Sequence, residues 1–210
     1  DNFAVQSAKW SVEEFSRRLK KYEQIVKDLQ DISCCVAYWG QQAHLPVLKM
    51  ALTRLTDRLE SKNGLVVWLA PRWYPTILLL YSAGISALAA EKYENLAGMF
   101  LTRVGSSRSL GASTELTLSV GEAILGLERS DAFKQLPGYE RHYVARSEYL
   151  FKLLQPTLGD LLFLGRDYEQ AFDRFEVLLA LVHADLENVE RSHIWGPIGR
   201  FGWKFRDFKF

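Results

Sequence analysis

Cysteine is scarce in this sequence: among 210 residues there are only two, the neighbouring Cys34 and Cys35. Adjacent cysteines rarely bridge and cannot staple distant parts of a chain, so a disulfide-stabilised scaffold is excluded. We interpret both side chains as small buried hydrophobes in a helix. The lack of a disulfide framework favours a reducing compartment, and we expect a cytoplasmic location.

An excess of charge is also lacking. The chain has 26 Lys and Arg against 25 Asp and Glu, which gives a formal net charge of +1. No global field would therefore attract nucleic acid or an anionic membrane, and any basic site must be local. We therefore expect neither nucleic acid nor a membrane as a partner, and expect instead a protein or a neighbouring domain of the same polypeptide.

Catalytic and metal-binding motifs are missing as well. The four histidines lie at no metal-ligand spacing, either among themselves or with the cysteines. Ser119 in LSVGE lacks the flanking glycines of a nucleophile elbow. We therefore expect no enzyme, no cofactor and no metal. The histidines are His44, His142, His183 and His193.

Strand-like alternation is nearly absent before residue 193, whereas apolar residues recur at spacings of three and four. The sequence therefore predicts an all-α fold of antiparallel α-hairpins, packed as a short solenoid or an irregular bundle. Residues 1–192 form one helical domain in this interpretation, with a possible subdivision at loop 105–113, and 193–210 form a tail. The expected helices are 12–39, 46–61, 76–90, 93–104, 114–127, 140–155, a short one after Pro156, and 168–189.

The segment WYPTILLLYSAGISALAA, residues 73–90, carries no charged residue. Its length is near the lower limit for spanning a bilayer, but Pro75 and Gly84 interrupt it and Arg72 and Glu91 close it. A helix that is apolar all round can also be the central helix of a water-soluble protein. We favour the buried central helix over membrane insertion.

A pattern Gly-x8-Tyr-x6-Phe occurs twice, first at Gly84, Tyr93 and Phe100 and again at Gly159, Tyr168 and Phe175. In a repeated helix pair, the glycine would let two helices approach closely and the aromatics would continue the packed face. At these residues the chain resembles a tetratricopeptide repeat, with GDLLFLGRDYEQAFDRF as the better copy. The resemblance implies tandem α-hairpins, whose exposed surfaces commonly bind other polypeptides.

The loop GSSRSLGAS, residues 105–113, precedes a predicted helix. Serine hydroxyls and arginines before a helix N-terminus could surround an anion, although the Gly-Lys-Ser/Thr ending of a phosphate-binding loop is absent. A solvated linker is the simpler interpretation. The residues of this ligand hypothesis are Arg103, Ser106, Ser107, Arg108 and Ser109.

The chain ends in SHIWGPIGRFGWKFRDFKF, which is rich in glycine, aromatic and basic residues. Alternation over 201–205 predicts a short strand, with Trp203 and Phe205 against the helical body and Lys204 and Arg206 in solvent. The tail could fold back onto the helices, begin a further domain, or act as a docking arm for protein or nucleic acid. The docking hypothesis rests on Trp195, Phe201, Trp203, Phe205 and Arg206.

Two functions follow from these patterns. The first is a non-enzymatic interaction, scaffold or sensor module, because packed helices are predicted and no catalytic signature is found. WYPTILLLYSAGISALA and WGPIGRFGW are also similar to helical regions that follow effector domains in large bacterial signalling and defence proteins, which implies a piece of such a protein. The alternative is a regulatory domain that binds a nucleotide or another anionic small ligand at loop 105–113.

Overall fold

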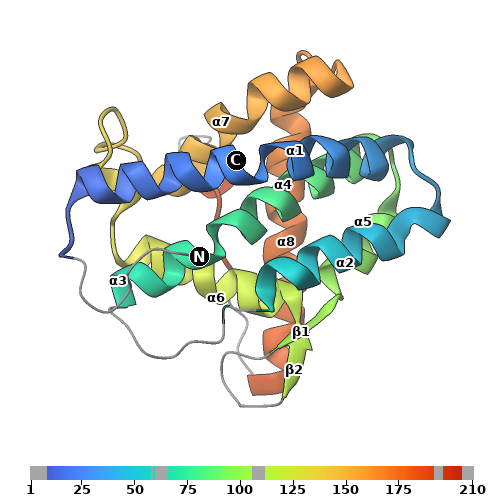
Figure 1. The fold of residues 1–210 in the computed structure, drawn as a ribbon, viewed down its shortest axis with the longest axis horizontal. Helices are drawn as coiled ribbons and strands as arrows, with labels where there is room; N and C mark the ends of the chain where they lie inside the picture. The colour runs from blue at the N-terminus through green and yellow to red at the C-terminus, as the bar shows by residue number, and fades with distance from the viewer. Residues whose placement is uncertain (1–8, 58, 60–65, 106–111, 192–195, 205–210) are drawn as a thin grey trace, which may run out of the picture.

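The computed structural model describes residues 9–57, 59, 66–105, 112–191 and 196–204, and in this part of the chain it is all-α, as predicted (Figure 1). The long helices are α1 (Val12–Trp39), α2 (Leu45–Thr56), α4 (Tyr74–Ala89), α6 (Leu116–Arg129), α7 (Ala145–Leu162) and α8 (Asp167–Arg191). Shorter helices are α3 (Val66–Leu69), α5 (Tyr93–Phe100), α9 (Phe201–Lys204), and the 3₁₀ turns η1 (Gln42–His44), η2 (Ala70–Trp73) and η3 (Phe133–Gln135).

Helix α1 begins and ends where the sequence predicts. The hydroxyl of Ser11 accepts a hydrogen bond from the Glu14 amide at 3.1 Å, which satisfies an otherwise unpaired amide of the first turn. Gly40 caps the other end. The apolar stripe that includes Phe15, Leu19 and Val26 is buried against α4, so one amphipathic face explains this helix.

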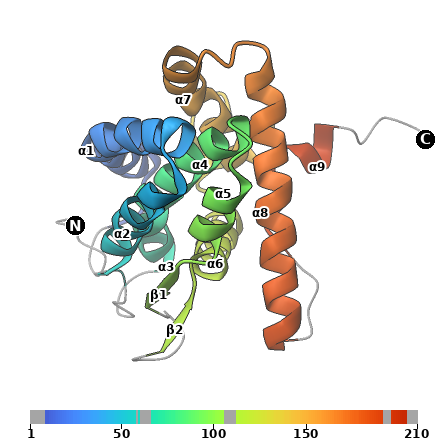
Figure 2. The same ribbon diagram turned by 90° about the vertical axis from the view of Figure 1, so that its right-hand side faces the viewer.

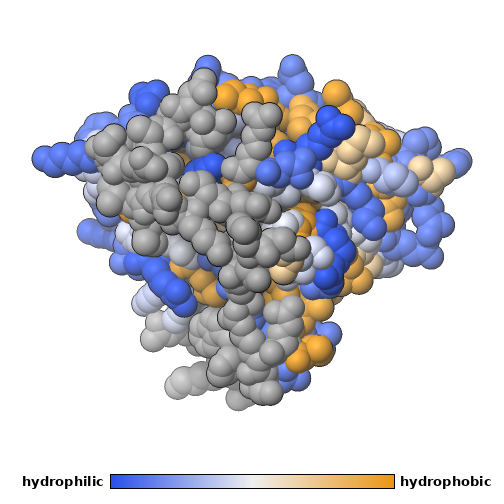
Figure 3. Space-filling model, turned by 60° about the horizontal axis from the view of Figure 1, so that its bottom comes forward, coloured by the Kyte–Doolittle hydropathy of each residue, from blue (hydrophilic) through white to orange (hydrophobic). Residues whose placement is uncertain are grey.

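Helix α4 is the centre of the molecule. All residues from Thr76 to Leu88 are buried, which confirms the buried helix predicted for residues 76–90. Helices α1 and α2 lie on one side of α4 and α8 lies on the other (Figure 2). Within the described residues, no helix is both long and apolar enough to cross a bilayer. On the face shown in Figure 3, hydrophobic side chains form separate groups between hydrophilic ones.

A small hairpin replaces the end of the helix predicted for 93–104. Helix α5 ends at Phe100, and β1 (Arg103–Gly105) pairs antiparallel with β2 (Ser113–Glu115), Arg103 lying opposite Glu115. Arg103 forms an ion pair with Glu115 at 2.6 Å, and Val104 is buried. These contacts join residues on either side of the loop, so helical spacing along the chain did not reveal them.

Helix α7 is continuous, whereas a break at Pro156 was expected. Proline removes one helical hydrogen bond and costs about 3 kcal/mol inside a helix. The same apolar face continues on both sides of Pro156. Its leucines are four residues apart and all buried: Leu150, Leu154, Leu158 and Leu162. Burial of these side chains outweighs the cost of the proline.

The glycine prediction is correct at Gly84 and wrong at Gly159. A Cβ atom at Gly84 would overlap the ring of Phe175, so α4 has the close helix crossing that was predicted there, and the neighbour is α8. At Gly159, a Cβ atom would meet nothing within 4 Å. Among the residues that the structure describes, no helix therefore crosses α7 closely at Gly159.

Candidate interaction surface around the C-terminal strap

Four polar side chains form a cluster in the interior between α4, α7 and α8. Glu176 accepts hydrogen bonds from the hydroxyl of Tyr81 at 3.0 Å and from Ser147 at 2.7 and 2.8 Å. Arg146 donates to the Tyr81 hydroxyl at 2.8 Å and lies 3.7 Å from the Glu176 carboxylate. Arg146 and Glu176 are each 2% exposed, so the cluster is a buried charge pair with hydrogen-bonded partners.

The pKa values of the pair follow from this burial. Desolvation raises the pKa of the Glu176 carboxyl, although Arg146 and the Ser147 and Tyr81 hydroxyls oppose that shift. Desolvation also disfavours the charged Arg146, but Tyr81, Glu128 and Glu176 outweigh it and raise the pKa of the guanidinium. The guanidinium additionally donates to Glu128, at 3.0 and 3.2 Å, where the cluster reaches the surface.

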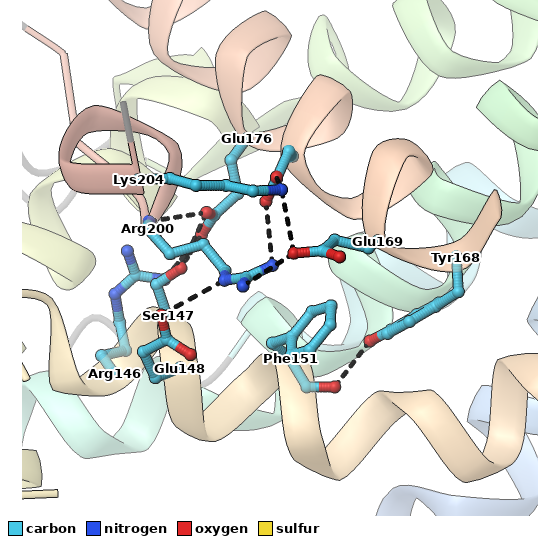
Figure 4. A network of polar contacts seen from close by, with 10 residues as sticks. Arg146, Ser147, Glu148, Phe151, Tyr168, Glu169, Glu176, Arg200 and Lys204 are labelled. Carbon is cyan, nitrogen blue, oxygen red and sulfur yellow. Dashed lines mark hydrogen bonds and ion pairs between the residues drawn. The ribbon is translucent and has the colours of Figure 1, made fainter. Parts of the chain in front are cut away.

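Residues 196–204, which we call the C-terminal strap, lie across this cluster (Figure 4). The backbone amide of Arg200 donates to Ser147 at 2.9 Å and to Glu176 at 3.1 Å. A Cβ atom at Gly199 would overlap the Glu176 carboxylate. Only glycine lets the backbone approach this closely, so the strap supplies a donor that a buried carboxylate needs.

The side chain of Arg200 is held in an arginine socket, formed by Glu148, Phe151, Glu169 and Asp173. Its nitrogens lie 3.1 to 3.2 Å from the three carboxylates, and its guanidinium carbon is 3.9 Å from the centre of the Phe151 ring. Arginine is the side chain best suited to such a site, because its planar fork bonds several carboxylates and stacks on an aromatic face.

Lys204 strengthens the same attachment. Its ammonium lies 2.8 Å from Glu169 and 2.9 Å from Asp173. The hydrogen bond from Lys204, together with that from Arg200, lowers the pKa of the Glu169 carboxyl below its ordinary value. Arg200 and Lys204 are four residues apart and reach the same two carboxylates, which explains why residues 201–204 form a helical turn instead of the predicted strand.

Substitution of Gly199 by alanine is expected to loosen the strap. The added methyl group would displace the carboxylate of Glu176 from Ser147 and Tyr81, and the amide of Arg200 would lose its acceptors. We expect a destabilisation of about 1–3 kcal/mol and faster proteolysis within the strap.

Urea unfolding and limited proteolysis of Gly199→Ala would measure both effects. Gly138→Ala is not a suitable control because its backbone φ is positive, whereas Gly159→Ala adds a methyl group where nothing lies within 4 Å. Equal proteolysis rates for Gly199→Ala and Gly159→Ala would contradict this account of the strap.

Residues of helix α9, which lies on the outer side of α8 (Figure 2), line two hollows on the surface of the molecule. One has a volume of about 350 Å³ and lies between Trp203, Ile198, Tyr143 and Phe133, with Arg146 at its base. The other, which we call the α8 groove, has a volume of about 770 Å³. Its lining is Leu88, Tyr93, Arg166, Glu169, Gln170, Asp173, Arg174, Val177, Leu178, Phe201 and Lys204.

The structure places two of the five predicted docking residues, Phe201 and Trp203, on α9. Trp203 is 40% exposed and stacks on Tyr143 with ring centres 4.5 Å apart, so it contacts the helical body as predicted. Lys204 is exposed, as expected, and its ammonium is also ion-paired with Glu169 and Asp173. Trp195, Phe205 and Arg206 lie outside the described residues.

The ligand hypothesis for loop 105–113 gains no support from the described residues. Arg103 donates to Ser113 and Glu115 across the hairpin, so its guanidinium has a structural role. Ser106, Ser107, Arg108 and Ser109 lie outside the described residues, and no ligand geometry can be assigned to them.

The residues of the internal pattern occupy different environments in its two copies. Phe175 packs on Gly84 of the first copy and lies 5.7 Å from Phe100, ring centre to ring centre. Tyr168 is buried and donates to the carbonyl of Phe151 at 2.8 Å, whereas Tyr93 is 51% exposed at the edge of the α8 groove. Parts of the two copies therefore pack against each other, and the repeat itself remains a prediction.

Sequence reasoning missed Arg146, Glu176 and Arg200, which organise this surface. One signal was available for Glu176: it falls on the apolar stripe of α8 with Phe172, Phe175 and Leu179, where a carboxylate is unexpected. The partners of Arg200 lie on α7 and α8, far away in sequence, so no local pattern could reveal the socket.

Neither a metal site in the described part of the chain nor a known relative points to a specific chemistry for this protein. Among the residues that the structure describes, no group of three or more His, Cys, Asp or Glu side chains could hold a metal ion. No protein-family model matches the sequence, and neither the curated proteins nor the solved structures searched gave a significant match.

Proposed function

We propose that this protein is a non-enzymatic interaction module, of scaffold or sensor type, whose partner binds on the face built around the C-terminal strap. The single observation that supports this function is the stacked pair of Trp203 and Tyr143. Both rings are exposed, 40% and 63% respectively, at the edge of the 350 Å³ hollow.

Such a pair has the properties of an interface hot spot. Tryptophan and tyrosine dominate the binding energy of many interfaces, because they bury a large area and lose few rotamers. Arg200 and Lys204 already fix α9 on α8 through four carboxylate contacts, so a partner would find Trp203 preorganised.

Photo-cross-linking from the position of Tyr143 tests this function. The photoreactive residue benzoyl-phenylalanine would replace Tyr143 in the full chain. On irradiation of the cells that express this variant, we expect it to form a covalent cross-link to one defined polypeptide. That polypeptide would then be purified and its affinity for the unmodified protein measured. Trp203→Ala should weaken binding by tenfold or more, as truncation of a hot-spot aromatic does.

Trp39→Ala is the matched control, because Trp39 is an exposed tryptophan on α1, away from the strap. The affinity of Trp39→Ala for the captured polypeptide should stay within twofold of that of the unmodified protein, as for an ordinary surface substitution. If Trp203→Ala and Trp39→Ala bind the captured polypeptide equally well, the strap face is not the interface.

A further inference from the structure

The outer face of α8 presents a regular seam that no described element of the protein covers. Gln170, Arg174, Val177 and Leu181 follow each other at spacings of four, three and four. Residues at these intervals lie along one side of a helix, and this spacing is the one that packs against a second helix. Leu181 is 60% exposed, so the seam continues past the groove into solvent.

The α8 groove gives this seam an apolar floor and walls. Gln170, Arg174 and Val177 line it together with Leu88 at the end of α4, Tyr93 at the start of α5 and Phe201 on α9. From Gln170 to Leu181 the seam runs for about 17 Å, which is about three helical turns. A small molecule could fill the 770 Å³ hollow but would not reach Leu181, whereas a helix of four turns covers the whole seam.

The charged residues in the groove indicate which sign of charge a partner should carry. Its two carboxylates, Glu169 and Asp173, are already bonded by Arg200 and Lys204 of the strap. The side chains of Arg166 and Arg174 form no ion pair or hydrogen bond with any described residue. Within the described part of the chain, these two cations therefore have no bonded carboxylate beside the apolar floor, which favours an anionic partner.

We infer that the α8 groove binds an acidic amphipathic helix of a partner polypeptide. The apolar residues of that helix, spaced by three and four, would pack on Leu88, Tyr93, Val177 and Leu181, and its carboxylates would pair with Arg166 and Arg174. The inference rests on the proposed interaction function, but it concerns a different side of α9 from the Trp203 and Tyr143 pair.

A designed peptide provides a direct probe. We would use a fluorescein-labelled helical peptide of four to five turns, with leucines at alternating spacings of three and four and glutamates beside them. Fluorescence anisotropy with the full chain is expected to give saturable binding that weakens with salt, because the contributing charges lie at the surface. The same peptide with every glutamate replaced by lysine should bind at least about tenfold more weakly.

Variants assign the binding to the groove. Arg174→Glu should weaken binding of the acidic peptide by about tenfold or more, since it replaces a cation with an anion that repels the glutamates of the peptide. Leu181→Ser should also weaken it, by removing apolar contact at the end of the seam. Arg54→Glu, which reverses an exposed arginine of α2, is the control and should bind within twofold of the unmodified protein. Circular dichroism melts would establish that all three variants are folded.

The inference is overturned if the acidic peptide does not bind, if the lysine peptide binds equally well, or if Arg174→Glu leaves affinity unchanged. Trp203→Ala separates this inference from the proposed function, because it should leave peptide binding intact. If the acidic peptide does not bind, but a cross-linked partner is found whose affinity depends on Trp203, the inference about the α8 groove is wrong and the proposed function stands. A bound peptide without any cross-linked partner would instead remove the assignment of Trp203.

Discussion

Replacement of Arg146 by methionine is expected to destabilise the protein by about 3–5 kcal/mol, the cost of leaving a buried charge without its partner. Methionine keeps much of the aliphatic volume but removes the donors to Tyr81 and Glu128, and the positive charge beside Glu176. The Glu176 carboxylate would stay 2% exposed, with only neutral donors around it. Urea unfolding of Arg146→Met and of the unmodified protein would measure this difference.

A double-mutant cycle separates the ion pair from simple loss of packing. Glu176→Gln keeps one acceptor oxygen, which can serve both Ser147 and the Arg200 amide, but removes the negative charge. If charge pairing dominates, the double variant with Arg146→Met should cost less than the sum of the two single costs, by about 0.5–3 kcal/mol. Arg129→Met, on the exposed surface of α6, should stay within about 0.5 kcal/mol of the unmodified protein. Additive single costs would argue against pairing as the main contribution of Arg146.

The same cluster shows where sequence reasoning reaches its limit. Helix α1 could be predicted to the residue, because its cap at Ser11, its stop at Gly40 and its apolar stripe are all local. The burial of α4 was equally predictable, since an uncharged, mostly apolar segment with Pro75 and Gly84 inside it and a charge at each end favours a buried helix over a membrane span. Both predictions depend on residues that are close together in the chain.

The strap depends on contacts between distant residues, and its conformation was predicted wrongly. Alternation of aromatic residues with Gly202 and Lys204 over 201–205 is a valid strand signal in isolation. In the folded protein, Asp173 and Glu169 on α8 accept from two cations four residues apart, and this geometry imposes a helical turn. The hairpin of β1 and β2 was missed for a similar reason, because Arg103 and Glu115 meet only across a loop.

The second large loss of stability is expected at Gly84, the first glycine of the internal pattern. We expect Gly84→Leu to destabilise the protein by about 3 kcal/mol or more, at or above the upper end of ordinary overpacking. The reason is the ring of Phe175, which occupies the space of the missing side chain and is itself fully buried. That ring also contacts Tyr81 and Phe100, at 4.8 and 5.7 Å between ring centres, so it has little room to move.

Gly159→Leu is the matched control, because it makes the same chemical change at the corresponding position of the second copy. No atom lies within 4 Å of a Cβ at Gly159, and replacing a glycine inside a helix removes a cost of about 0.5–1 kcal/mol. The melting temperature should therefore fall by several degrees or more for Gly84→Leu and stay level or rise for Gly159→Leu. Equal losses at the two sites would mean that α7 also has a close crossing at Gly159, and that the two copies pack more alike than the structure indicates.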